Sequence, residues 1–122
     1  MPASKPEPAA LLEATIDYLE RELLPTLTGY HRFQCRVTVN VLGQVHRELQ
    51  LGAAQAEAEE ARLRALLGHA GERDQLNREL AARIRAGEVP LDDRAVLEHV
   101  RLSLMEALRI NNPKWLEPTG EP

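Results

Sequence analysis

Arginine and asparagine side chains recur at helical spacing in one stretch of the sequence and could together bind an anion. At 100° per residue, Arg36, Asn40 and Arg47 fall in a sector about 60° wide, with Gly43 between them. The two guanidinium groups would lie about 16 Å apart along the axis, and arginine binds carboxylates and phosphates through paired hydrogen bonds. The alternative interpretation is an ordinary solvent face, or ion pairs with acidic residues of neighbouring helices.

Residue types that bind metals or act as nucleophiles are present, but they lack the spacing that those chemistries need. The four histidines and the single cysteine form no HxxxH, HExxH or CxxC motif. Neither GxxxxGK[ST] nor GxGxxG occurs, and no serine sits in a strand-turn-helix elbow. The sequence therefore predicts no catalytic residue, no metal and no cofactor, and an enzyme would require groups from separate helices to converge.

The elements that carry these residues are expected to be five helices. Apolar residues recur every three to four positions in five stretches, which are residues 8–24, 31–51, 53–67, 74–86 and 92–110. Pro25, Gly68 and Gly87 stand where the first, third and fourth of these stretches end. Asn77 lies at the edge of the fourth apolar stripe, so its amide is expected to bond across helices, to Asn40 or to a helix terminus.

The second stretch is the most ambiguous, because Val37, Val39 and Val41 alternate with polar residues as in a strand. Phe33, Val37, Val41, Val45 and Leu49, however, continue at steps of four for about five turns. A lone strand among helices would also have no partner for its backbone groups. We therefore predict a helix whose wide apolar arc makes it the central helix of the bundle.

The expected architecture is a single all-α bundle over residues 8–116, with flexible termini at residues 1–7 and 117–122. Trp115 and Leu116 are expected to fold back onto this bundle. Leu102 and Met105 share the outer side of the fifth helix, away from its main apolar stripe. That stripe is expected to face the core and consists of Leu97, Val100, Leu104, Ala107 and Leu108. Leu102 and Met105 are candidates for an interface with a homodimer partner or with another protein.

Composition narrows the classes of partner. The 122 residues include 15 basic and 19 acidic ones, which gives a net charge of −4 and no bulk attraction for nucleic acid or an anionic membrane. No apolar run approaches the ~20 residues of a membrane span, and the beginning of the chain lacks the apolar region of a secretory signal. With a single cysteine, a cytoplasmic location is expected.

Three segments carry a resemblance to a known family. FQCRVTVNVLGQVHRELQLG at 33–52, LNRELAARIRAGEVPLDD at 76–93 and INNPKWL at 110–116 are similar to a bacterial family of uncharacterised small helical domains. That family has F-x-x-R-V-A-A-N-A-L and L-N-x-x-L-x-x-R-I-R-A-G patterns, and the resemblance spans residues 11–116. The chain departs from it at Thr38, Val39, Val41 and Gly43, where small alanines are common.

The resemblance implies which proteins such a domain accompanies, rather than a reaction that it catalyses. Such domains are found beside, or fused to, aminoglycoside-phosphotransferase-like kinases linked to acyl-CoA metabolism, and the family brings no activity that could be assigned to a residue. We therefore expect a non-catalytic accessory or interaction domain that acts with a kinase-like partner. The rival hypothesis is a small-molecule-binding protein that takes a phosphorylated or CoA-type anion on Arg36, Asn40 and Arg47.

Overall fold

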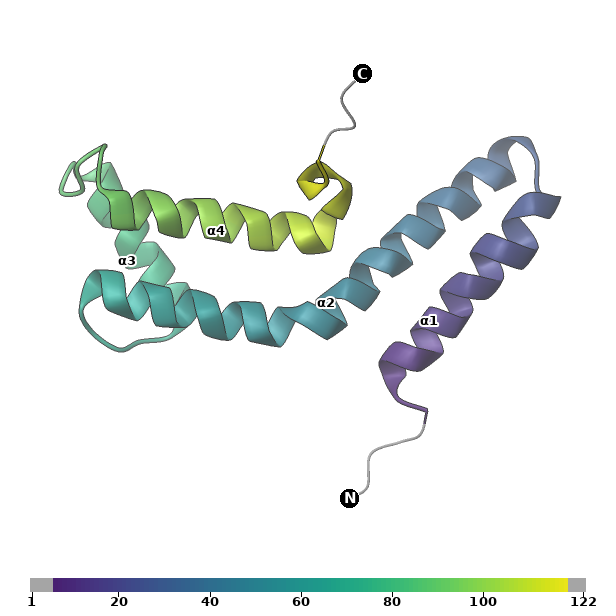
Figure 1. Ribbon diagram of the computed structural model, residues 1–122, viewed down its shortest axis with the longest axis horizontal. Helices are drawn as coiled ribbons and strands as arrows, with labels where there is room; N and C mark the ends of the chain where they lie inside the picture. Colours follow the sequence, from purple (N-terminus) through teal and green to yellow (C-terminus); the bar gives the residue numbers. More distant parts are fainter. Residues whose placement is uncertain (1–5, 119–122) are drawn as a thin grey trace. The chain divides into compact units, whose positions relative to one another are not determined.

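The regular structure of residues 6–118, the part that this computed structural model describes, is helical throughout (Figure 1). Four α-helices follow one another along the chain, namely α1 (Pro8–Tyr18), α2 (Gly29–Leu67), α3 (Arg73–Arg85) and α4 (Arg94–Asn111). A π-helical turn covers Leu19–Leu23, and 3₁₀ turns cover Leu24–Thr26 and Pro113–Leu116. The all-α prediction is confirmed. Of the termini expected to be flexible, residues 1–5 and 119–122 lie outside the described residues.

The predicted count of five helices is wrong by one. The second and third predicted helices are a single helix, α2, which continues through Gly52. Glycine lowers helix stability by about 1 kcal/mol relative to alanine, but it keeps its N–H and therefore does not interrupt the hydrogen-bond ladder as proline does. Gly52 keeps a negative φ angle, whereas Gly68 and Gly87 have φ angles of 79° and 77°. Those two left-handed glycines follow α2 and α3, as predicted.

The chain divides into two compact units, Met1–Leu51 and Gly52–Pro122, and the division falls within α2. In the first unit, α1 lies alongside the first part of α2 (Figure 1). In the second unit, the remainder of α2 packs with α3 and α4. We call these the N-terminal unit and the C-terminal unit.

The N-terminal unit is closed by an arginine at its helix connection. The Arg32 guanidinium donates hydrogen bonds to the Leu24 carbonyl at 3.0 Å and to the Leu27 carbonyl at 3.4 Å. The Leu24 carbonyl also accepts a hydrogen bond from the Leu27 N–H at 3.2 Å. A cation beside carbonyls at the end of a helix complements the helix dipole. On the facing side of α2, the Cys35 thiol lies 3.8 Å from the Leu19 carbonyl.

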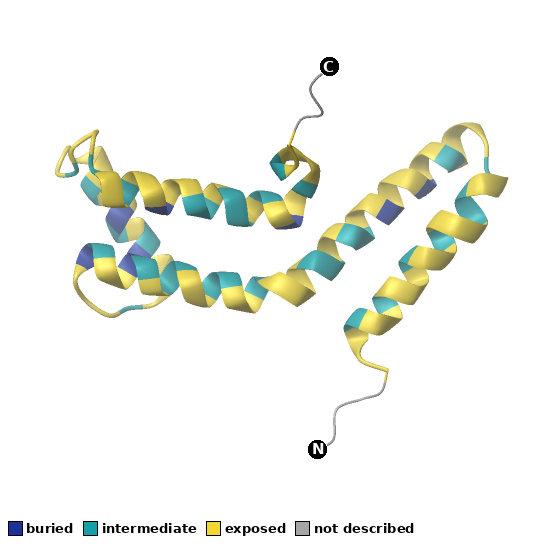
Figure 2. Cartoon of the chain, viewed as in Figure 1, coloured by how far each residue is buried: buried dark blue, intermediate teal, exposed yellow. Residues whose placement is uncertain are grey.

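The C-terminal unit contains the best-packed apolar cluster of the described chain. Leu63 and Leu76 are 0% and 1% exposed, and Leu67 and Leu80 are buried beside them (Figure 2). Helix α4 begins at Arg94, directly after its N-cap Asp93, whose carboxylate accepts a hydrogen bond from the Val96 N–H at 3.0 Å. Of the two residues expected to fold back onto the helices, Trp115 is 76% exposed and Leu116 is half-buried.

Candidate interaction surfaces

The apolar residues spaced at steps of four on α2 lie at the surface. Phe33, Val37, Val41, Val45 and Leu49, which we call the α2 ridge, are 62%, 40%, 54%, 45% and 56% exposed. The prediction placed this face inside a bundle, on a central helix. In the N-terminal unit, the buried positions of α2 lie on the side that faces the preceding helical segment (Figure 2). A contact there joins the Cys35 thiol to the carbonyl of Leu19, in the π-helical turn that follows α1. The ridge is therefore an apolar face that the described part of this unit leaves uncovered.

The residues predicted to bind an anion share one sector of the same helix. Arg36 and Asn40 are exposed, and Arg47 is half-buried. The Arg47 guanidinium lies over Gly43: a Cβ atom built at that glycine would be only 3.2 Å from Arg47 Nη1. The two cavities described below are lined by residues of the other unit, so the anion site on α2 stays a prediction.

A polar network that the sequence analysis did not predict crosses from α2 to α4 in the C-terminal unit. The Arg62 guanidinium donates to both carboxylate oxygens of Glu106, at 2.7 and 3.2 Å. It also donates to His99 Nδ1 at 3.0 Å and to the Ser103 hydroxyl at 3.3 Å. Gln55 adds a bond from its amide to the Glu106 carbonyl at 3.0 Å. Arginine presents several donors in one plane, which explains how a single side chain holds three partners on α4.

His99 is the buried polar residue of this network, with 5% of its surface exposed. Because Nδ1 accepts a hydrogen bond from Arg62, the proton of the neutral ring lies on Nε2. Burial disfavours the charged imidazolium, and the Arg62 guanidinium repels it, so both lower the pKa of His99 below its ordinary value of 6.5. The imidazole is therefore a neutral component of the network at pH 7.

Stability should fall on mild acidification because of His99. Its pKa is lower in the folded than in the unfolded chain, so the unfolded chain binds the proton more readily. The stabilising contribution is present above pH 6.5 and is lost as the pH falls from 6.5 towards the folded pKa. We expect the urea midpoint to drop between about pH 7.5 and about pH 5.5 by more in the wild type than in His99→Asn, whose amide oxygen can replace Nδ1 as the acceptor.

The matched control is His69, an exposed histidine with a shift of opposite sign. Its hydrogen bond to Glu79, 2.8 Å from Nε2, raises the pKa of His69 above 6.5. That contribution is present below pH 6.5 and is lost as the pH rises through the folded pKa. His69→Asn should therefore steepen the loss of stability on acidification, and equal pH profiles for the wild type and His99→Asn would contradict the assignment to His99.

A shallow cavity of about 270 Å³ lies beside this network, and we call it the α3–α4 groove. Glu59, Asn77, His99 and Ser103 contribute polar groups to its lining, and the Asn77 amide donates to a Glu59 carboxylate oxygen at 2.7 Å. The predicted partner of Asn77, Asn40 or a helix terminus, is therefore wrong, although the bond does cross between helices. The apolar lining comes from α3 and α4, namely Leu80, Ala81, Ile84, Val100 and Leu104.

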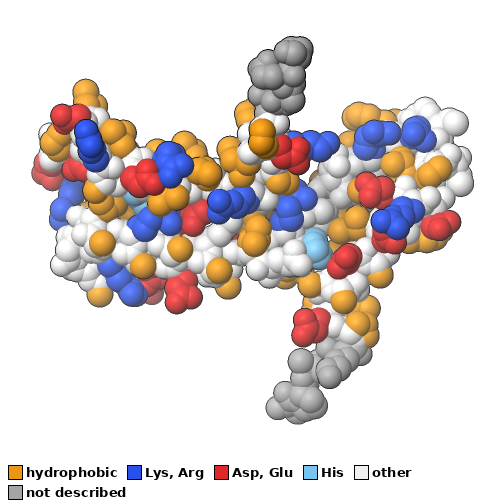
Figure 3. Space-filling model, viewed as in Figure 1, with side chains coloured by type: hydrophobic (Ala, Val, Ile, Leu, Met, Phe, Trp, Pro, Cys, Tyr) orange, Lys and Arg blue, Asp and Glu red, His pale blue; other side chains and the backbone are white. Residues whose placement is uncertain are grey.

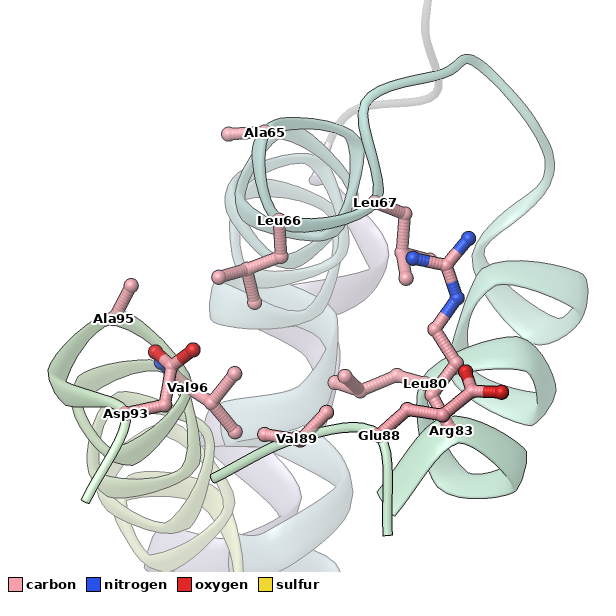
Figure 4. Close-up of a pocket in the computed structure, with 10 residues that line it drawn as sticks. All are labelled: Ala65, Leu66, Leu67, Leu80, Arg83, Glu88, Val89, Asp93, Ala95 and Val96. Carbon is pink, nitrogen blue, oxygen red and sulfur yellow. The ribbon is translucent and has the colours of Figure 1, made fainter. Parts of the chain in front are cut away.

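A second cavity, of about 440 Å³, opens between the end of α2, the start of α4 and the segment that joins α3 to α4 (Figure 4). Figure 4 shows Leu66, Leu80, Val89 and Val96 turned towards one another across it. Two of its charged groups already have structural partners, because Arg83 pairs with Glu79 at 2.7 Å and Asp93 caps α4. We therefore assign this cavity to the packing of the joining segment rather than to a ligand.

The predicted interface residues of α4 are half-buried. Leu102 and Met105 are both of intermediate exposure, and the Arg101 guanidinium lies 3.0 Å from the Met105 sulfur. The exposed large apolar residues of α4 are instead Leu97, Val100 and Leu104, which were predicted to lie on its main apolar stripe. Figure 3 shows hydrophobic side chains at the surface among the charged ones.

The comparison with protein families identifies the chain. A model for a domain of unknown function, DUF6285, matches residues 25–115, about three quarters of the sequence. The chain belongs to the DUF6285 family. No curated protein and no solved structure matches this DUF6285 domain. The matched range begins before α2 and ends within the last 3₁₀ turn, so it contains the α2 ridge, the polar network and the α3–α4 groove.

Over the described residues 6–118 of the chain, no helix combines the length and apolarity that crossing a bilayer requires. Among the same residues, no group of three or more histidine, cysteine or acidic side chains is placed so that it could bind a metal ion.

The network around Arg62 had a weak signal in the sequence. Gln55, Glu59 and Arg62 are spaced by four and three residues, so they share one face of a helix that also carries Leu66. Polar residues that continue an apolar face must find partners across the helix interface if they are buried. The partners of Gln55 and Arg62 on α4 lie 37 to 51 residues away along the chain, and the partner of Glu59 is Asn77 of α3, 18 residues away. Periodicity alone cannot reveal such distant pairs.

Proposed function

We propose that this DUF6285 domain is a non-catalytic interaction domain that binds a partner protein in the α3–α4 groove. The observation that carries the proposal is the exposure of the large aliphatic residues along the groove. Ile84, Val100 and Leu104 are 45%, 41% and 61% exposed beside a cavity of about 270 Å³. Covering one half-exposed aliphatic side chain with a partner's apolar surface would contribute roughly 1 kcal/mol to the free energy of binding.

The polar residues of the groove would make such binding selective. Glu59 is the charged residue of the lining, while the nearby Arg62 is neutralised by Glu106. A partner helix with an apolar face and one basic or amide side chain would match both the aliphatic rim and the Glu59 carboxylate. A purely apolar helix would leave that carboxylate desolvated, at a cost that disfavours unspecific binding.

The partner that we propose is a phosphotransferase-like kinase, on the strength of the sequence resemblance described above. An accessory role needs no catalytic group in this chain, in keeping with the absence of catalytic motifs from its sequence. The kinase-like protein would supply the chemistry, and the DUF6285 domain would hold or position it.

Replacing Leu104 with Asp should reduce the recovery of a kinase-like protein at least tenfold. The substitution puts a charge at the centre of the apolar rim, and the residue is exposed enough for the fold to tolerate it. The tagged full-length chain would be used to capture proteins from native lysate of the source organism, and bound proteins would be identified by mass spectrometry.

Leu91→Asp is the matched control, because Leu91 is 98% exposed in the segment between α3 and α4 and does not line the groove. It should recover the same amount of kinase-like protein as the wild type. Equal recovery by Leu104→Asp would show that the groove is not the binding site. Failure of the wild type to recover any kinase-like protein would contradict the proposed partner.

A further inference from the structure

We propose that the α2 ridge binds a second copy of this chain, with the two α2 helices antiparallel and related by a twofold axis at Val41. This inference goes beyond the proposed function, because it concerns the other unit, another surface and another partner. It rests on how little the N-terminal unit buries, on the symmetry of the ridge and on the charges around it.

The described part of the N-terminal unit does not form an apolar core of the usual size. Its buried hydrophobic residues are Cys35 and Val39, at 9% and 7% exposure. Isolated helices are marginal in water, and most of their stability in proteins comes from packing an apolar face. A helical pair that leaves five large apolar residues of one ridge exposed needs a further surface, and the ridge of a second pair supplies it.

The spacing of the ridge determines how another helix can pack on it. Residues at i, i+4, i+8, i+12 and i+16 form one continuous row that runs obliquely to the helix axis. Two such rows pack into each other's grooves when the helices cross at about −50°, which is the commonest helix packing in globular proteins. An identical helix therefore has the surface that the ridge requires.

The order of residues along the ridge is symmetric about its centre. An antiparallel copy with its axis at Val41 places Val41 beside its own equivalent and Val37 beside the second copy's Val45. Phe33 then lies near the second copy's Leu49, so the largest side chains are at the two ends and the β-branched ones are in the middle. Every member of the ridge has an apolar counterpart, as a self-complementary twofold contact requires.

Charges around the ridge do not oppose this pairing. Arg36 and Arg47 lie about 140° and 120° around the helix from Val41, so neither guanidinium faces its equivalent across the axis. Glu48 and Gln34 lie seven residues on either side of Val41, and the twofold axis therefore brings the carboxylate of one copy near the amide of the other. That amide can donate a hydrogen bond to the carboxylate.

The exposed area also suits a second copy. Five side chains that are each about half exposed present roughly 400 Å² of apolar surface, the size of a functional patch on a monomer. A standard interface buries about 800 Å² on each partner and consists of an apolar centre with a polar rim. The ridge would be that centre, and neighbouring polar residues such as Gln34 and Glu48 would form the rim.

Sedimentation velocity of the full chain, from low to high micromolar concentration, tests the proposal. The wild type should approach twice the chain mass of 13.7 kDa, and Val41→Glu should remain at 13.7 kDa because two carboxylates would meet at the axis. Gln50→Glu introduces the same charge on an exposed position of the same helix, about 180° around from Val41, and should still dimerise. Helicity measured by circular dichroism would show whether Val41→Glu has folded.

Cross-linking keeps the proposal testable if Val41→Glu does not fold. In a Cys35→Ala background, Val41→Cys should give a covalent dimer with a short bismaleimide, because only a residue near a twofold axis lies close to its own equivalent. Gln50→Cys, on the opposite side of the helix, should remain at least tenfold less cross-linked.

Three results would overturn the inference. They are a wild type that is monomeric at every concentration, a dimer that Val41→Glu leaves intact while folded, and equal cross-linking of the Val41→Cys and Gln50→Cys variants. Recovery of the kinase-like protein by Val41→Glu would show that the groove proposal holds separately. Loss of that protein together with a monomeric wild type would assign the ridge to the kinase-like partner instead.

Discussion

Replacing Leu63 with Ala should lower the free energy of unfolding by about 2–5 kcal/mol, the range seen when a fully buried leucine is truncated. Leu63 is 0% exposed and packs with Leu67, Leu76 and Leu80, which come from both α2 and α3. Removing the end of this side chain loses apolar burial and leaves a cavity between two helices. Because the surrounding side chains relax only partly into such a space, the remaining cavity adds to the lost burial.

Urea unfolding followed by far-ultraviolet circular dichroism would measure the change. Leu91→Ala is the matched control, because the same atoms are removed from a side chain that is 98% exposed. Its free energy of unfolding should stay within about 0.5 kcal/mol of the wild type. A change of similar size in both variants would contradict the position of Leu63 at the centre of the unit.

The helices themselves could be predicted from local pattern. Apolar periodicity located every α-helix of the described chain, and steps of four from Phe33 to Leu49 correctly outweighed the strand-like alternation around Val39. The left-handed glycines and the Asp93 cap also follow from local backbone chemistry. The predicted stop at Pro25 is less accurate, because α1 ends at Tyr18 and π and 3₁₀ turns continue through Pro25 to Thr26. The predicted break at Gly52 is wrong, because glycine lowers the stability of a helix but can still be part of one.

Which apolar faces are covered could not be predicted in the same way. A stripe at helical spacing indicates that a face needs a partner, but it does not say whether that partner lies in the same chain. Val41 and Leu104 were both expected in the core, and they are 54% and 61% exposed. The core that does form uses Leu63 and Leu76, whose helices α2 and α3 are adjacent in sequence and joined by a short connection.

The candidate sites differ in the same way: residues of one helix could be grouped from the sequence, and partners far apart along the chain could not. Arg36, Asn40 and Arg47 could be grouped by spacing, since they share one helix. The network of Arg62 could not, because its partners on α4 lie 37 to 44 residues further along the chain. Two surfaces thus remain for partners. The α2 ridge matches its own copy, whereas the α3–α4 groove has an acidic, polar lining that is better suited to a different protein.

Replacing Arg62 with Ala should destabilise the chain by about 2–3 kcal/mol. The side chains of Arg62 and Glu106 are only 20% and 14% exposed, so the variant leaves the Glu106 carboxylate partly desolvated without its two donors. Removing one member of a fully buried pair costs about 3–5 kcal/mol, and the residual exposure here lowers that figure. His99 Nδ1 would also lose its hydrogen bond from Arg62, which adds to the destabilisation.

Arg64→Ala provides the control on the same helix, because Arg64 pairs with Glu60 at the surface, where ion pairs contribute a few tenths of a kcal/mol. Both variants lose the same side chain, so the difference between their urea midpoints isolates the network. Arg62→Ala and Glu106→Ala should also be less than additive, since each removes the same interaction. Full additivity in that double-mutant cycle, or an Arg62→Ala midpoint equal to that of Arg64→Ala, would mean that the network does not hold α2 to α4. The Leu63 cluster would then be the main support of this unit.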